Sequence, residues 1–201
     1  MPVDMKIWNA EKEKAWRQLS EDLEIGYLDE DIRPVLLEFF RRPCSFTKSS
    51  CSGRIVIVDA NMPWERQKAT ILFKKHSPIT VEEIAPFYNQ RVLYNLWIIA
   101  SGPIIHAITC NLKEALTILK IARNAGFKHS GILSIRKSGI VIELVTGVRA
   151  EILLKRGNKV IVKLDELPEV VEILNRVLLM GKERLEKLYR VLKQYNEEIC
   201  C

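Results

Sequence analysis

Apolar residues at helical spacing predict that the chain begins with two helices. The first covers residues 5–24 and is stopped by Gly26. The second begins at Asp29 and ends at Pro43, because proline does not continue a helix. The apolar positions that mark these helices are Trp8, Ala15, Trp16, Leu19 and Leu23 in the first, and Ile32, Leu36, Phe39 and Phe40 in the second.

From residue 45 onward, short apolar runs predict strands. We expect them at about residues 46–48, 55–58, 69–74, 96–100, 104–110, 130–136, 140–146, 150–156 and 159–163. Between them, Thr80-Val81-Glu82-Glu83 is a capping-box signature that opens a short helix, and Asn111 caps a longer helix over residues 112–125. A last helix is expected over residues 166–197, either continuous or broken once, with Gly181 as the place of the break.

The order of these elements favours an α+β fold over a doubly wound parallel sheet, because strands and helices do not alternate strictly. The turns Lys137-Ser138-Gly139 and Arg156-Gly157-Asn158 indicate antiparallel hairpins. We therefore expect a largely antiparallel or mixed sheet, which could be barrel-like, with flanking helices. The expected organisation is a single domain over residues 1–201, with a helical N-terminal segment 1–43, a sheet-containing core 44–163 and a C-terminal helix 166–197.

Composition excludes several classes of protein. Of the 201 residues, 48% are hydrophobic and 28% are charged, which is ordinary for a globular protein and excludes disorder or a disulfide-stapled miniprotein. The densest apolar run, residues 96–100, breaks at Ser101-Gly102-Pro103, far short of the ~20 residues that a membrane span needs. The first residues lack a signal-peptide pattern. We therefore expect a cytoplasmic protein with no membrane contact.

Positive charge is concentrated in one part of the chain. The net charge is +6, yet residues 120–163 hold ten Lys and Arg side chains against only Glu143 and Glu151. Such a block attracts polyanions, and nucleic-acid phosphates are common ones. A solvated basic face without a partner explains the same charge equally well.

The five cysteines predict neither a disulfide framework nor a zinc site. They stand at positions 44, 51, 110, 200 and 201, without a Cys-x-x-Cys pair. Their spacing relative to His106 matches no common structural zinc pattern. We expect no metal.

Phosphate-binding glycine motifs are absent, which leaves both a Rossmann nucleotide site and a P-loop unsupported. The strongest local feature is Ser49-Ser50-Cys51-Ser52-Gly53-Arg54, between two predicted strands. Gly53 permits an unusual turn, the small side chains expose backbone N–H groups, and Arg54 can bind a carboxylate or a phosphate. A plain hairpin turn is an alternative, and a Cys51 nucleophile is another.

Three further segments carry candidate chemistry. Lys74-Lys75-His76-Ser77 follows a strand and could bind an anion or move a proton, or it is a solvated loop. His106 lies within an apolar strand, where a hydrogen-bonded core histidine is the commoner role. His129-Ser130-Gly131 follows the helix stop at Gly126 and also reads as a simple helix-to-strand turn.

Taken in order, these segments resemble the wybutosine-synthesising tRNA methyltransferase family. The resemblance spans roughly residues 15 to 190, and the Ser-Ser-Cys-Ser-Gly-Arg hexapeptide is its specific part. The other blocks are Gly26-Tyr27-Leu28-Asp29-Glu30, the lysine–histidine loop, Pro103-Ile104-Ile105-His106-Ala107 and the segment from Ala122 through Gly126-Phe127-Lys128-His129-Ser130-Gly131-Ile132.

The resemblance implies S-adenosylmethionine-dependent methylation of ring nitrogen N-4 of a demethylwyosine-type base at position 37 of phenylalanine tRNA. It also implies an α+β scaffold distinct from the Rossmann methyltransferases. The alternatives are a tRNA- or RNA-binding protein without catalysis and a hydrolase that uses Cys51. The oligomeric state stays open.

For the site, we expect His76 to accept the proton and Arg54 to assist catalysis. The hexapeptide residues Ser49, Ser50, Cys51, Ser52, Gly53 and Arg54 are expected to hold the cofactor. The expected substrate contacts are Lys74, Lys75, His106, Ser130, Gly131 and Arg136, with the basic block against the tRNA stem.

Overall fold

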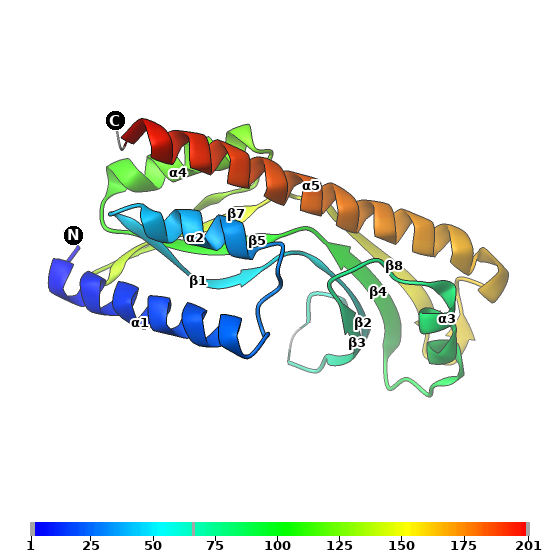
Figure 1. Ribbon diagram of the computed structural model, residues 1–201. Helices are drawn as coiled ribbons and strands as arrows, with labels where there is room; N and C mark the ends of the chain where they lie inside the picture. Colours follow the sequence, from blue (N-terminus) through cyan, green and yellow to red (C-terminus); the bar gives the residue numbers. More distant parts are fainter. Residues whose placement is uncertain (1–2, 66, 200–201) are drawn as a thin grey trace. The chain divides into compact units, whose positions relative to one another are not determined.

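A computed structural model of the chain describes residues 3–65 and 67–199 (Figure 1). Its helices are α1 (Met5–Glu24), α2 (Arg33–Arg41), α3 (Val81–Ile84), α4 (Leu112–Asn124) and α5 (Leu167–Ile199), with short 3-10 turns at Ala85–Asn89 and Leu164–Glu166. Its strands are β1 (Ser45–Cys51), β2 (Arg54–Ala60), β3 (Thr70–Lys75), β4 (Asn95–Ser101), β5 (Ile104–Thr109), β6 (Gly131–Arg136), β7 (Gly139–Val145), β8 (Arg149–Arg156) and β9 (Lys159–Val160).

The residues group into two units, each assembled from separate stretches of chain. The first takes its described residues from 1–52, 103–147 and 182–201, and the second takes them from 53–102 and 148–181. The chain passes from one unit to the other four times, and α5 contributes residues to both. Because neither unit is a continuous segment, neither can be cut out of the sequence in one piece.

The first unit contains a four-stranded antiparallel sheet in the order β1-β5-β7-β6. Helices α2 and α4 and the C-terminal part of α5 cover one face, where Phe39, Ile105, Ile118 and Leu188 are fully buried (Figure 1). On the other face, Trp8 of α1 packs edge-on against Phe46, with Ile108 and Cys110 beside it. The alternation of Ala107 and Ile108 between these two cores follows from the two-residue period of a strand.

The second unit contains a five-stranded antiparallel sheet in the order β3-β2-β4-β8-β9. One face packs against α3 and the N-terminal part of α5, and its core includes Ile57, Ile98, Leu154 and Leu174. The opposite face carries a smaller apolar cluster, formed by Val56, Val58, Ala60 and Ile99.

Most predicted elements are confirmed, and so is the α+β class with antiparallel sheets. The predicted caps are present, because Asn111 accepts a hydrogen bond from the Glu114 N–H at 2.8 Å and Thr80 forms the full capping box. The barrel-like alternative is wrong: among the described residues the end strands of each sheet pair with no strand that would close it. No helix in the described ranges is both long and apolar enough to span a membrane.

Of the two alternatives for the last helix, the continuous one is confirmed: α5 runs through Gly181 and buries Leu178 before it and Leu185 after it. This burial outweighs the cost of about 1 kcal/mol for a helical glycine. The helix expected from Asp29 begins only at Arg33, after a turn. Whether the chain is a single domain stays a prediction.

A buried polar network joins three helices of the first unit. Arg42 is 3% exposed and donates to both carboxylate oxygens of Glu114, at 2.5 and 3.0 Å, and to the side-chain oxygen of Asn196 at 2.6 Å. Asn196 in turn donates to the carboxylate of the buried Glu38 at 2.8 Å. A buried charge that loses its partner is costly, so this network is sensitive to single substitutions.

We therefore expect Arg42→Ala to lower the free energy of unfolding by about 3–5 kcal/mol, because Glu114, whose side chain is only 13% exposed, would lose its cation. Urea denaturation measures the change. Arg17→Ala removes a surface pair with Glu13 in which both side chains are well exposed, and it should change stability by at most about 1 kcal/mol. Equal effects of the two substitutions would contradict the role assigned to Arg42.

We propose that the two units unfold together, because the chain crosses between them four times. The tryptophans allow a test, since Trp8 and Trp16 belong to the first unit and Trp64 and Trp97 to the second. In each of the double variants W8F/W16F and W64F/W97F, fluorescence then reports one unit while circular dichroism reports the whole chain. We expect both signals to share one midpoint in each variant. Separate midpoints would show two domains.

Candidate functional site

The hexapeptide 49–54 lies where the chain passes from the first unit to the second. Residues 49–52 belong to the first unit, and Gly53 and Arg54 begin the second. Its two halves therefore make different contacts, each within its own unit.

A bulge in β1 brings Ser49 to a histidine. Lys48 and Ser49 together oppose the single residue His106 of β5, and such bulges redirect side chains. The Ser49 hydroxyl lies 2.9 Å from His106 Nδ1, and Glu143, directly opposite on β7, lies 3.1 Å from Nε2. If Nε2–H donates to Glu143, Nδ1 can accept a hydrogen bond from the Ser49 hydroxyl. Glu143 thus orients the imidazole.

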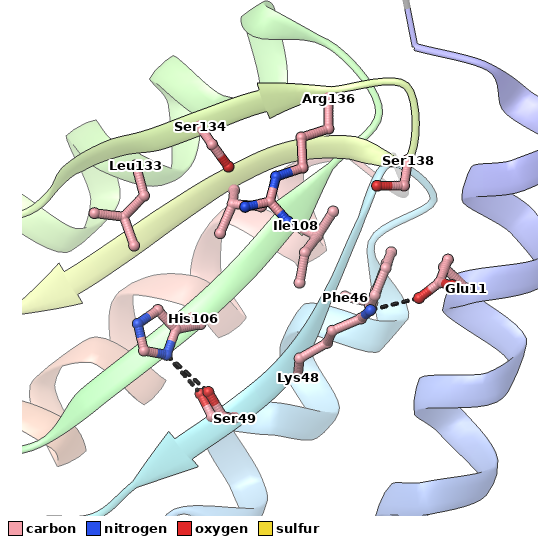
Figure 2. A pocket seen from close by; sticks show the side chains of 11 residues that line it. Glu11, Phe46, Lys48, Ser49, His106, Ile108, Leu133, Ser134, Arg136 and Ser138 are labelled. Atoms are coloured by element: carbon pink, nitrogen blue, oxygen red, sulfur yellow. Dashed lines mark hydrogen bonds and ion pairs between the residues drawn. The ribbon is translucent and has the colours of Figure 1, made fainter. Parts of the chain in front are cut away.

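Lys48, Ser49 and His106 line a pocket of about 350 Å³ on the sheet of the first unit (Figure 2). The volume lies within the range of small-molecule sites. Lys48 pairs with Glu11 of α1, and this hydrogen bond lowers the pKa of the Glu11 carboxyl below its usual value. Arg136 extends from the end of β6 across the pocket (Figure 2). The apolar lining consists of Phe46, Ile108, Leu133 and Val141.

The hydroxyls of Ser52 and Ser50 differ in their hydrogen bonding. Ser52 is fully buried and donates to Asp29 at 2.7 Å, while Lys182 donates to the Ser52 hydroxyl at 2.8 Å. Its hydroxyl is therefore used to anchor the hexapeptide. The Ser50 hydroxyl is buried and has no hydrogen-bond partner in the described part of the chain. An unsatisfied buried hydroxyl is costly, and a bound ligand would satisfy it.

Gly53 confirms the predicted unusual turn. Its φ is +99°, and a Cβ atom placed there would lie 2.9 Å from the Ser101 carbonyl oxygen. Only glycine fits such a close backbone approach. The Gly53 carbonyl in turn lies 2.9 Å from His76 Nδ1. If Nδ1–H donates to that carbonyl, Nε2 of the neutral ring keeps its lone pair. Tertiary structure thus brings His76 to the hexapeptide.

The other predicted site residues differ in whether their side chains already have a hydrogen-bonding or charged partner. Among the described residues, the side chains of Arg54 and Lys74 have neither an acidic nor a hydrogen-bonding partner. Lys75 instead pairs with Glu83 at 2.6 Å, the residue that closes the capping box of α3. Ser130 is buried and donates to the Phe127 carbonyl at 2.7 Å, so its hydroxyl stabilises a turn. Gly131 begins β6 opposite Glu143 and has open space around it.

The cations of the basic block at 120–163 do not form one exposed surface. Its residues are divided between the two units at position 147. Lys155 is buried and donates to the carbonyls of Tyr88 and Gln90 at 2.9 Å each, so it cannot face a phosphate. Arg149 pairs with Glu151. Arg136 is the member of the block that reaches the pocket.

The cysteines form no metal cluster in the described ranges, where no group of three or more potential ligands comes together. Cys44 and Cys110 lie just beyond the end of the β1–β5 ladder, where the Cys110 N–H donates to the Cys44 carbonyl at 3.0 Å. Burial raises the pKa of the Cys110 thiol to about 11, which keeps it protonated at neutral pH. Cys200 and Cys201 lie outside the described residues.

Sequence reasoning missed several residues of this site, namely Glu11, Lys48, Glu143, Asp29 and Lys182. Glu143 had a usable signal, since it is an isolated acidic residue in an otherwise apolar strand. Lys48 directly precedes the hexapeptide. Nothing in the sequence of α1 distinguishes Glu11 from the other acidic residues of that helix, because its role depends on the neighbouring strand.

Two solved structures share the fold of this chain. The PH1069 protein from Pyrococcus horikoshii superposes with a TM-score of 0.85 at 29% identity, covering 94% of this chain and 97% of that one. A hypothetical protein from Aeropyrum pernix superposes with a TM-score of 0.75 at 30% identity, covering 83% of this chain and 98% of its own.

Curated relatives are named as tRNA(Phe) 7-((3-amino-3-carboxypropyl)-4-demethylwyosine(37)-N(4))-methyltransferases. The protein from Saccharolobus solfataricus is 45% identical over 189 residues, which are 94% of this chain and 90% of the relative. The protein from Thermococcus sibiricus is 33% identical over 183 residues, which are 91% and 93% of the two chains. The family model described as Methyltransferase TYW3 matches residues 10–194. As its motifs predicted, this chain belongs to the Methyltransferase TYW3 family.

Proposed function

We propose that this chain methylates ring nitrogen N-4 of a 4-demethylwyosine derivative at position 37 of phenylalanine tRNA, with S-adenosylmethionine as the methyl donor. The observation that carries the proposal is the 45% identity, over 94% of the chain, to a relative named for this reaction. The family match over residues 10–194 agrees with it. The sequence prediction of a tRNA methyltransferase is thereby confirmed.

The reaction defines what the residues of this chain have to do. S-adenosylmethionine supplies an electrophilic methyl group on a sulfonium, so little covalent help is needed. The protein must align the ring nitrogen and remove its proton. Alignment of two reactants contributes about 7–11 kcal/mol in the best intramolecular models. A positioned general base contributes a factor of about 10²–10⁴.

The residues of the hexapeptide fit an amino-acid-bearing cofactor. The Ser50 hydroxyl is buried without a partner in the described structure, so it is available to a polar ligand atom. The guanidinium of Arg54 has no acidic partner among the described residues and can bind a carboxylate. Ser49, Cys51, Ser52 and Gly53 supply the backbone of the same segment. These features support the hexapeptide as the cofactor segment.

His76 is the proposed proton acceptor. Its hydrogen bond with the Gly53 carbonyl orients the ring, and the neutral imidazole then accepts a proton at Nε2. Arg54 begins the strand that follows Gly53 and is the proposed electrostatic partner in catalysis. Lys74, His106 and Arg136 remain the proposed contacts to the substrate, whereas Lys75 and Ser130 act through the structure they stabilise.

The tRNA would be held by the exposed cations of the basic block 120–163, and the target base by stacking and edge contacts. With that substrate, we expect the protein in the cytoplasm. A non-catalytic RNA-binding protein and a Cys51-dependent hydrolase were the alternatives from sequence. The comparisons favour the methyltransferase over both, and the assay below separates all three.

We expect purified protein to transfer labelled methyl groups from S-adenosylmethionine to phenylalanine tRNA that carries the 4-demethylwyosine precursor. The same tRNA with unmodified guanosine 37 is the control and should stay unlabelled. Cys51→Ser should retain activity, because the reaction needs no thiol nucleophile. Salt-sensitive tRNA binding without any methyl transfer would instead support the binding protein.

We expect His76→Ala to lower kcat by about 10²–10⁴-fold, because the ring N–H would lose its base. Arg54→Ala should chiefly raise the KM for S-adenosylmethionine, since it removes a charged contact. Arg91→Ala is the control, because Arg91 is exposed and belongs to the same unit. Melting curves would confirm that each variant folds. Unchanged rates in both site variants would remove these assignments and leave the function intact.

A further inference from the structure

The pocket of Figure 2 holds one cation more than its own residues neutralise. Glu11 and Lys48 form an ion pair on one side. Arg136 reaches in from β6, and its guanidinium has no acidic partner in the part of the chain that the structure describes. A guanidinium that lacks a counter-ion at the wall of a pocket favours an anionic ligand.

The acidic residue in the same pocket restricts which anion fits. The pKa of the Glu11 carboxyl is lowered by its hydrogen bond from Lys48, so Glu11 is charged at neutral pH. A phosphate beside it would be repelled. A ligand that carries one cation and one anion would instead satisfy both Glu11 and Arg136. Glu11 can accept from Lys48 and from the ligand together, because a carboxylate offers about four acceptor sites.

Between the charged groups lies an apolar surface. Phe46 and Ile108 line the pocket together with Val141, and Figure 2 shows Arg136 extending over Ile108. A short hydrocarbon stem would cover these side chains and release water from them. Ser49 and His106 complete the rim and connect the pocket to the hexapeptide.

We propose that this pocket binds the zwitterionic 3-amino-3-carboxypropyl group, with the carboxylate on Arg136, the ammonium on Glu11, and the two methylenes on Phe46 and Ile108. The proposal rests on the proposed function, in which two molecules carry this group. One is the methyl donor, which bears it on sulfur; with the donor as the source, its carboxylate would lie on Arg136 instead of Arg54. The other is the tRNA base, since the relatives are named for a substrate with this substituent.

Calorimetric binding tests the donor as the source. S-adenosylhomocysteine carries the zwitterion without the reactive methyl, and 5′-methylthioadenosine carries the same nucleoside without the zwitterion. If the donor's group occupies the pocket, Glu11→Gln and Arg136→Gln each weaken S-adenosylhomocysteine binding by about 10- to 100-fold. Binding of 5′-methylthioadenosine stays unchanged, which also shows that the variants fold.

Kinetics test the base as the source. If the tRNA substituent occupies the pocket, the same variants keep their affinity for S-adenosylhomocysteine. They then raise the KM for tRNA with the aminocarboxypropyl group by a similar factor. The KM for tRNA with 4-demethylwyosine alone would not change. Glu13→Gln is the matched control, since Glu13 is exposed, lies near Glu11 in the sequence and does not line the pocket.

Variants that alter neither S-adenosylhomocysteine binding nor either KM would overturn the proposal. That outcome differs from failure of the proposed function. Wild-type protein could transfer no methyl group while the variants still bind S-adenosylhomocysteine more weakly and 5′-methylthioadenosine as before. That result would support the pocket assignment and contradict the proposed function.

Discussion

The arrangement of strands depends on a close backbone contact at Gly53. Only two residues separate β1 from β2, yet these strands join different sheets. The chain changes sheet at Gly53, whose φ is +99° and where a Cβ atom would lie 2.9 Å from the Ser101 carbonyl oxygen. The later passage from β7 to β8 also uses a glycine with positive φ, Gly147. Residues that look like turns of continuous hairpins are therefore the points where the chain changes sheet.

This constraint explains why the chemistry gathers around residues 49–54. Upstream of Gly53, the bulge in β1 turns Ser49 toward His106, and Glu143 fixes the ring from the next strand. Downstream, the Gly53 carbonyl orients His76. The hexapeptide thus contributes to two sets of polar groups, one in each unit. A methyl transfer needs a cofactor segment, a base and substrate contacts, and these groups supply candidates for each.

Much of this could be predicted because the signals are local. Caps such as Asn111 and Thr80 act within a few residues, and the two-residue period of the strands is visible in the chain. The family motif likewise lies within six consecutive residues. Gly181 shows what local signals leave open, since burial of Leu178 and Leu185, which decides for a continuous helix, outweighs its poor helix propensity. Lys155 shows that a count of charges does not reveal which of them are exposed. Its ammonium is buried and donates to two backbone carbonyls.

The amino-acid sequence by itself determined the element types, the α+β class, the hexapeptide and the family. Only the tertiary structure decided how strands are shared between two sheets and which side chains meet. Glu11 and Arg136 are far apart in the chain, and they share a pocket because α1 and β6 belong to the same unit. Periodicity and propensity describe neighbours along the chain. Charge pairing across strands and helices depends on long-range packing, which no local pattern encodes.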